Sequence, residues 1–100
     1  MDNYEVLLSP KALRDLDAVY AYISSVLQAP DTAEALIDKL EAEIFSLEQF
    51  PYRSPERNIG SYANKGYRQL LVKNYTVIYR IDETHKQVVI ITVRYSRSKP

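Results

Sequence analysis

Apolar residues recur every three or four positions in two segments of the first half of the chain, the spacing that gives a helix one buried stripe. The first segment, residues 10–27, starts at Ser9-Pro10, a pair that suits the N-cap and first helical positions. The second, residues 31–49, starts with Asp31 and Glu34 in the form of a capping box. The two stripes are Leu13, Leu16, Tyr20, Ile23 and Leu27, and Ala33, Leu36, Ile37, Leu40, Ile44 and Leu47.

Only a short connection containing Ala29-Pro30 separates the two predicted helices. Helices joined so closely form an antiparallel hairpin. We expect this hairpin to pack on a sheet through Leu16, Ile23, Leu40 and Ile44.

Four shorter segments have the β-branched and aromatic composition of strands: residues 4–8, 67–73, 75–82 and 88–95. Lys73-Asn74 leaves room only for a tight turn, in which Asn74 tolerates a positive φ. Residues 88–91 are apolar on both faces, as in a central strand. Alternation along the third segment places Arg80 on the same face as Thr76 and Ile78.

This order of elements predicts a two-layer α+β fold in a single domain that covers residues 1–100. Residues 51–66 lack periodicity and are rich in Pro, Gly and Asn, so they form a long loop. Loops of this length are uncommon unless they are functional or mobile.

The amino-acid composition excludes several kinds of site. There is no cysteine and only one histidine, which excludes a disulfide framework and a thiolate or histidine-rich metal site. No stretch has the apolar length of a membrane span. We therefore expect a soluble cytoplasmic protein that has no cofactor and no membrane contact.

The net charge of zero hides an asymmetry between the two halves of the chain. Residues 1–49 hold ten acids and three bases, whereas residues 50–100 hold ten bases and three acids. A basic half of this kind indicates an anionic partner, either nucleic acid or an acidic protein segment. The alternative is that the two halves offset each other as solvated faces of one domain.

Nucleotide-binding, zinc and nucleophile-elbow motifs are absent, and His85 falls in a predicted surface turn. What remains is a set of lysine, arginine and tyrosine side chains. The planar guanidinium of arginine can bind two phosphate oxygens, and the tyrosine ring can stack on a nucleotide base. The same residues suit cross-strand packing, and about half of the tyrosines, Tyr75 among them, are assigned to the core. The set is Lys65, Tyr67, Arg68, Tyr79, Arg80, Arg94, Tyr95 and Arg97.

Four motifs in this order resemble the RelE/ParE toxins of bacterial type II toxin–antitoxin systems. They are SPKALRDLDAVYAYI (residues 9–23), FPYRSP (50–55), KGYRQLLVKNYTVIYRID (65–82) and VRYSRS (93–98). The resemblance implies a helical hairpin packed on one side of a mostly antiparallel four-stranded sheet, with the last strand beside the first. It also implies a cognate antitoxin that forms a hetero-oligomer with the chain and covers part of its basic surface.

The family has two activities. RelE-like members cleave mRNA on the ribosome without a metal, and ParE-like members inhibit DNA gyrase and are not nucleases. Nuclease members often carry an arginine where this chain has Thr76, and some carry a histidine where it has Ser96. In the nuclease interpretation the resemblance implies catalytic roles for Arg68, Arg94, Tyr95 and Arg80, and nucleic-acid binding by Lys65, Tyr67, Lys73 and Arg97.

The cation and phenol set favours an mRNA endonuclease that blocks translation, in which arginines stabilise the charge that builds on the phosphate. Inhibition of gyrase is the second hypothesis. A non-toxic binding module that shares only the fold is the third, because a fold does not fix a function.

Overall fold

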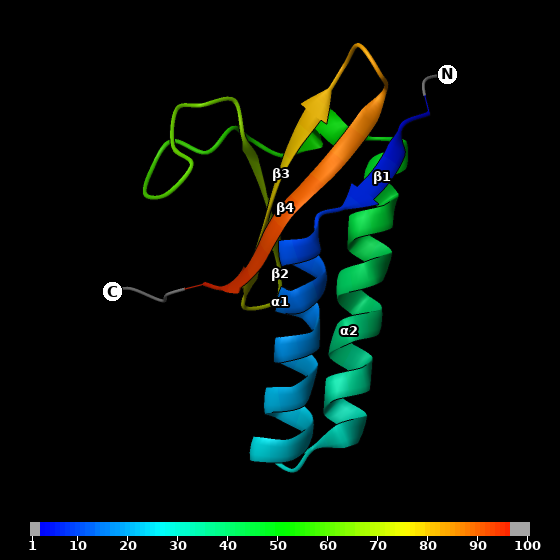
Figure 1. Cartoon of the computed structure of the whole chain (residues 1–100), viewed down its shortest axis with the longest axis vertical. Helices are drawn as coiled ribbons and strands as arrows, with labels where there is room; N and C mark the ends of the chain where they lie inside the picture. The colour runs from blue at the N-terminus through cyan, green and yellow to red at the C-terminus, as the bar shows by residue number, and fades with distance from the viewer. Residues whose placement is uncertain (1–2, 97–100) are drawn as a thin grey trace.

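The computed structural model describes residues 3–96, in which two helices pack on one face of a four-stranded sheet (Figure 1). This confirms the predicted α+β class and the predicted order of elements. The elements are β1 (Glu5–Leu8), α1 (Pro10–Ala21), a π-helical turn (Tyr22–Val26), α2 (Pro30–Phe45), two 3₁₀ turns (Ser46–Glu48 and Pro51–Arg53), β2 (Arg68–Val72), β3 (Tyr75–Asp82) and β4 (Gln87–Tyr95).

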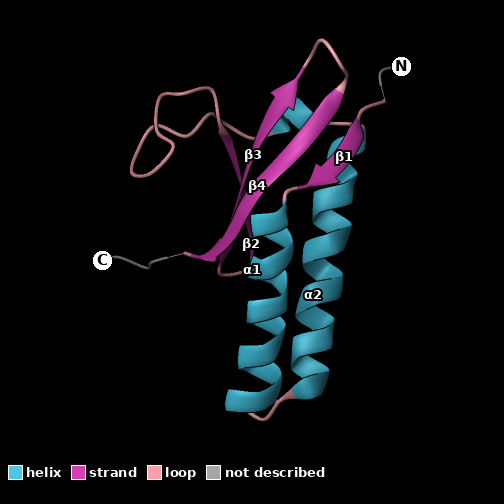
Figure 2. Cartoon of the chain, viewed as in Figure 1, coloured by secondary structure: helices cyan, strands magenta, loops and turns pink. Residues whose placement is uncertain are grey.

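The strands follow the order β1-β4-β3-β2, so the last strand lies inside the sheet beside the first (Figure 2). β1 is parallel to β4, and the two remaining pairs are antiparallel. Val88 and Ile90 of β4 are fully buried. These observations confirm the mostly antiparallel sheet and the central position of the last strand.

Helix α1 begins as predicted. Ser9 Oγ accepts a hydrogen bond from the backbone N–H of Ala12 at 3.0 Å, and Pro10 occupies the first turn. The α-helix ends at Ala21 and the chain continues as the π-helical turn, so the predicted uninterrupted helix over residues 10–27 is wrong in its last turns.

Helix α2 begins at Pro30, one residue before the predicted start. Its N-cap is Ala29, which gives no side-chain hydrogen bond, and Asp31 lies inside the first turn. The predicted capping box is therefore wrong. Proline suits the first helical position because it has no N–H to satisfy and its φ is already helical.

The core confirms the burial of Leu16, Ile23, Leu40 and Ile44. Three members of the stripe predicted for the first helix are instead exposed, namely Leu13, Tyr20 and Leu27. Helix α1 is rotated so that Ala12, which has no exposed surface, faces the core together with Leu16. A small residue there lets the helix approach the sheet closely. The hairpin also extends well past the sheet, which leaves the far end without a cover (Figure 1).

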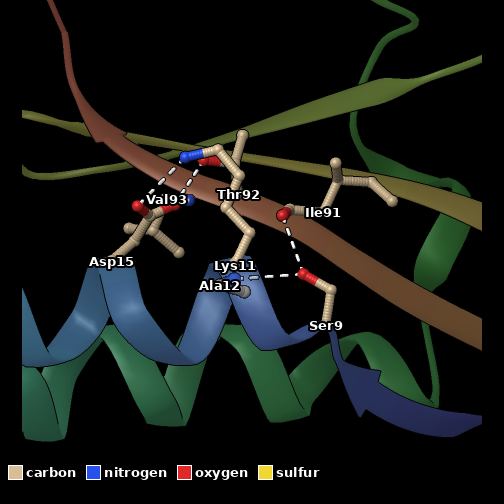
Figure 3. Close-up of polar contacts among 7 residues, drawn as sticks. All are labelled: Ser9, Lys11, Ala12, Asp15, Ile91, Thr92 and Val93. Atoms are coloured by element: carbon tan, nitrogen blue, oxygen red, sulfur yellow. Dashed lines mark hydrogen bonds and ion pairs between the residues drawn. The ribbon is translucent and has the colours of Figure 1, made fainter.

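Beyond the end of β1, residues at the start of α1 provide hydrogen-bond partners for the backbone of β4 (Figure 3). The pairing of β3 with β4 shifts between Ile78 and Tyr79, which leaves Ile91 as an extra residue. Ser9 Oγ donates to the Ile91 carbonyl at 2.8 Å, and Asp15 accepts from the Val93 N–H at 3.0 Å and from the Thr92 hydroxyl.

Burial alone would raise the pKa of Asp15, but these hydrogen bonds and Lys11, which lies 3.2 Å away, hold it below its ordinary value.

Two further details differ from the sequence expectation. In the β2–β3 turn it is Lys73, with φ 54°, that adopts the left-handed conformation, and Asn74 does not. Tyr79 belongs to the core rather than to a surface set of phenols: it has no exposed area, and its hydroxyl donates to the Pro51 carbonyl at 2.7 Å.

Candidate functional site

Strand register places the four predicted catalytic residues on two faces of the sheet. Arg68 lies opposite Tyr79, whose side chain packs in the helix-facing core. Arg94 lies opposite Thr76, and Arg80 follows Tyr79, so both point to the face opposite the helix-facing core. We call it the open face below, although Thr76 and Ile78 on it are buried. The predicted common face of Thr76, Ile78 and Arg80 follows from the same alternation, whereas Arg68 does not share that face.

The guanidinium of Arg68 is engaged by the fold. It donates to the Ser54 carbonyl at 2.5 Å, lies 5.0 Å from the centre of the Tyr52 ring, and lies 3.8 Å from the Glu56 carboxylate. Two backbone hydrogen bonds join the same two segments: the Gln69 N–H donates to the Pro55 carbonyl, and the Arg57 N–H donates to the Tyr67 carbonyl. Arg68 thus fastens the long loop to the edge of β2.

Arg80 and Arg94 are separated along the open face. Thr76 is opposite Arg94, and Arg80 lies four positions further along β3, which is roughly 13 Å at the rise of a strand. Arg80 is exposed. Arg94 is half-buried, and its guanidinium carbon lies 5.7 Å from the centre of the Tyr62 ring. One phosphate could touch both side chains only at the limit of their reach.

The long loop, α1 and the end of β4 enclose a groove of about 670 Å³. Its charged lining comprises Lys11, Asp15, Arg57 and Arg94, with Ser61 and Tyr95 beside them. The Arg57 side chain holds the loop, because it donates to the Ser61 carbonyl at 2.6 Å and to Gln69 Oε1 at 2.8 Å. We name this space the cationic groove.

Thr76 and Ser96 also line the cationic groove, and their hydroxyl oxygens lie 2.6 Å apart. At the two positions where the sequence resemblance implies an arginine or a histidine in nuclease members, this chain thus has two hydroxyls bonded to each other. His85 lies in the β3–β4 turn, where Nδ1 is 2.9 Å from Asp82. Asp15, whose pKa is lowered, is the carboxylate that lines the groove, and a lowered pKa makes it a weak general base.

The remaining predicted nucleic-acid contacts are spread out. Tyr67 packs edge to face against Tyr62 at 5.0 Å, and Lys65 is exposed on the loop. Lys73 lies in the β2–β3 turn beside a separate apolar pocket. Arg97 falls outside the described residues. Of the predicted site residues that lie within residues 3–96, the cationic groove therefore gathers Arg94 and Tyr95 but not the others.

The apolar pocket has a volume of about 440 Å³ and lies between the helical hairpin and the end of the sheet. It is lined by Ile23, Leu36, Tyr75 and Tyr95. Tyr75 is half-buried against the core, as predicted, and packs edge to face with the exposed Tyr95 at 5.5 Å. A neighbouring hollow is lined by Tyr75 and Tyr95 together with the exposed Tyr22 and Leu27. Val26 of the π-helical turn is also exposed.

A polar cluster that sequence analysis missed lies at the β3–β4 turn. The Glu83 carboxylate accepts hydrogen bonds from Tyr52 at 2.6 Å, Tyr4 at 3.0 Å and Lys86 at 2.5 Å. The Lys86 bond, followed by the tyrosine bonds, lowers the pKa of Glu83 to about 2. Lys86 lies in the same turn, three residues after Glu83, whereas Tyr4 and Tyr52 come from two distant segments, so no local sequence signal could have found the two tyrosines.

Within residues 3–96 no group of three potential metal-ligating side chains occurs, and no helix is both long and apolar enough to cross a lipid bilayer.

Comparison with known proteins places this geometry in a family. A family model described as the ParE toxin of type II toxin-antitoxin system, parDE, matches residues 6–100. No curated protein matches the chain.

Among solved structures, the chromosomal ParDE toxin–antitoxin system of P. aeruginosa is 21% identical, with a TM-score of 0.77, and the match covers 94% of this chain and 97% of that one. The RelBE2 toxin–antitoxin complex of Mycobacterium tuberculosis is 26% identical, with a TM-score of 0.65 and coverages of 93% and 98%. The isolated E. coli RelE toxin is 12% identical, with a TM-score of 0.64 and coverages of 96% and 87%. On the match to its family model, which spans nearly the whole length, the chain belongs to the ParE toxin family of type II toxin–antitoxin systems.

Proposed function

We propose that this toxin arrests bacterial growth by binding and inhibiting DNA gyrase, and that it does not cleave RNA. The observation that carries the proposal is the dispersal of the four candidate catalytic side chains over two faces of the sheet. The sequence alone favoured cleavage of mRNA, because it could not reveal how those side chains are used.

Cleavage at a ribose 2′-hydroxyl needs a proton acceptor within hydrogen-bond reach and cations that stabilise the charge on one phosphate. Arg68 is already engaged with Ser54, Tyr52 and Glu56. Arg80 stands roughly 13 Å along the strand from the position opposite Arg94. These placements favour a protein target over a scissile phosphate.

The surface of the protein supports a target of this kind. Binding energy between proteins is concentrated in aromatic and arginine side chains that become desolvated. Exposed aromatic and aliphatic side chains lie together beside the apolar pocket, at Tyr95, Tyr22 and Leu27. Inhibition of gyrase is the activity that the resemblance implies for ParE-like members.

One observation favours the second candidate, an mRNA endonuclease. The cationic groove brings Arg57, Arg94 and Lys11 together with the phenol of Tyr95, and arginine forks suit phosphate oxygens. Cleavage there would also need a proton acceptor, and the lowered pKa of Asp15 makes that carboxylate a weak general base.

An antitoxin is the proposed regulatory partner. The M. tuberculosis relative is described as a toxin–antitoxin complex. By analogy we propose a hetero-oligomer in which the antitoxin covers part of the basic surface of this chain, in the cytoplasm where gyrase and ribosomes both occur.

The test is to express the toxin in bacteria while following labelled thymidine and labelled amino acids, and to assay purified toxin on gyrase-driven DNA supercoiling. We expect DNA synthesis to fall first and supercoiling to stop. Early loss of translation, together with new mRNA 5′ ends in primer extension, would instead establish the endonuclease.

A further inference from the structure

The end of the helical hairpin extends past the sheet and carries apolar side chains that the fold leaves in water (Figure 1). We name residues 17–38 the hairpin tip; they comprise the last turn of α1, the π-helical turn, the connection and the first half of α2. Exposed apolar side chains that lie together mark surfaces that bind another molecule. The large apolar side chains that the tip exposes, by 42% to 65%, are Tyr20, Tyr22, Val26 and Leu27.

The π-helical turn brings one of these side chains to the surface. Ile23 is buried, and in a continuous α-helix Val26, three residues later, would lie on the same side. Here the Leu27 N–H donates instead to the Tyr22 carbonyl at 3.0 Å, five residues back, so the turn is longer and Val26 is 65% exposed. Single π-helical turns within helices occur frequently at functional sites.

The hairpin tip is acidic and contains no lysine, arginine or histidine. Its four acidic side chains are exposed, and within residues 3–96 none of them forms an ion pair. Lys39, the next residue, pairs with Glu43 at 3.1 Å and not with the tip. Negative charges without a cation therefore surround the exposed apolar side chains. The four acids are Asp17, Asp31, Glu34 and Asp38.

This charge determines which kind of partner fits the hairpin tip. A second copy that docked through the same surface would bring two sets of these carboxylates together, and like charges at an interface are costly. A basic, apolar partner would remove the apolar side chains from water and pair the carboxylates. Enzymes that act on DNA carry basic surfaces, because lysine and arginine neutralise the phosphates.

We propose that the hairpin tip binds a basic, apolar surface of DNA gyrase. The inference rests on the proposed function and adds to it the surface that contacts the target and its recognition chemistry. Tyr22 and Val26 become desolvated at the centre of the interface, and Glu34 and Asp38 pair with lysine or arginine at its rim. The cationic groove lies at the other end of α1, where Lys11 lines it, and stays outside this contact.

The charged part is tested by the binding of purified toxin to gyrase, measured by surface plasmon resonance at several salt concentrations. Glu34→Lys combined with Asp38→Lys should weaken binding by about tenfold or more and slow association, because both side chains then repel a basic partner. Glu48→Lys is the control, because it reverses an exposed acid in the same half of the chain outside the tip. It should change affinity by less than about threefold.

The apolar part is tested separately by Val26→Ser. Val26 is already exposed, so the melting temperature should stay within about 2 °C of wild type. Binding to gyrase should weaken by about fivefold or more, because an apolar side chain that is desolvated at the interface is lost. This variant keeps the inference testable where the double lysine variant is poorly folded.

A peptide probe tests the surface without gyrase. An acetylated, amidated peptide of leucine and lysine with helical amphipathic spacing is titrated into ¹⁵N-labelled toxin and followed by NMR. We expect the amide signals of Tyr22, Val26 and Glu34 to move. The same peptide with glutamate in place of lysine has the same apolar face and is the control. It should bind about tenfold more weakly or less tightly still, because its carboxylates meet those of the tip.

Inhibition of supercoiling by wild type and by all tip variants alike would overturn the inference and keep gyrase as the target. A concentration-dependent dimer that Val26→Ser dissociates would overturn it in favour of a second copy. Variants that lose the antitoxin but still inhibit gyrase would overturn it in favour of the antitoxin. Wild-type toxin that leaves supercoiling intact would refute the proposed target. Movement of the tip signals with the lysine peptide would then still support a basic partner, and no movement would overturn that as well.

Discussion

Replacing Arg68 by Ala should destabilise the fold, because this side chain holds the long loop against β2. The change leaves the carbonyl of the buried Ser54 without its donor, at a cost of about 1–3 kcal/mol. Loss of the contact with Tyr52 adds about 0.5–1 kcal/mol. The Glu56 side chain is 64% exposed, so its ion pair adds little.

The sum, about 1.5–4 kcal/mol, should lower the melting temperature by at least roughly 6 °C in a chain of this length. Thermal unfolding followed by circular dichroism measures the shift. Arg80→Ala is the matched control, because Arg80 is exposed on β3, and its melting temperature should stay within about 2 °C of wild type.

A gyrase assay distinguishes a role of Arg68 in holding the loop from a direct contact with the target. Folded Arg68→Ala, assayed well below its melting temperature, should inhibit supercoiling nearly as well as wild type, since Arg68 acts through the loop. A variant with unchanged melting temperature that had lost its toxicity would show instead that Arg68 contacts the target directly. That outcome would refute the structural role and restore the catalytic role suggested by the sequence.

Three further predictions concern stability. Leu40→Ala should cost about 2–5 kcal/mol, because Leu40 has no exposed surface, and an unchanged denaturation midpoint would remove it from the core. Asp15→Asn should cost about 1–3 kcal/mol in urea unfolding, because it disrupts the bonds to Thr92 and Val93, and a loss no larger than that of exposed Asp17→Asn would contradict this. The folded pKa of Glu83, about 2, is depressed, so its stabilisation is full above the unfolded value of 4.5 and is lost as pH falls toward 2. Glu83→Gln should therefore lower the melting temperature at pH 7 more than at pH 3, and an equal loss at both would refute this.

The sequence predicted where the helices and strands lie better than it predicted which of their side chains are buried. Periodicity located both helices and all four strands, because an element that buries one face has apolar residues at regular intervals in its sequence. It misjudged the face of α1, where Ala12 rather than Leu13 is buried. A small residue carries little weight in a hydrophobic pattern, yet here it allows the close approach that brings Asp15 to β4.

The candidate site was harder to predict because its residues are positioned by irregular structure. Alternation correctly places Arg80 on the open face. It cannot anticipate the extra residue at Ile91, which shifts the pairing before β4 reaches Arg94. Nor can it foresee that Arg68 bonds to a carbonyl, since every residue has one and only the path of the loop brings Ser54 within reach.

The charge asymmetry has a consequence for partners. Among ion pairs in residues 3–96, Arg53 with Glu43 is the one that joins the acidic half of the chain to the basic half. Within residues 3–96, ion pairing between the two halves therefore neutralises little of this charge, and the hairpin stays acidic while the loop and sheet stay basic. An acidic partner would be attracted to the basic side of the molecule. A toxin bound in this way would keep its acidic hairpin and the exposed apolar residues at its end, which leaves a separate surface on which a second protein could bind.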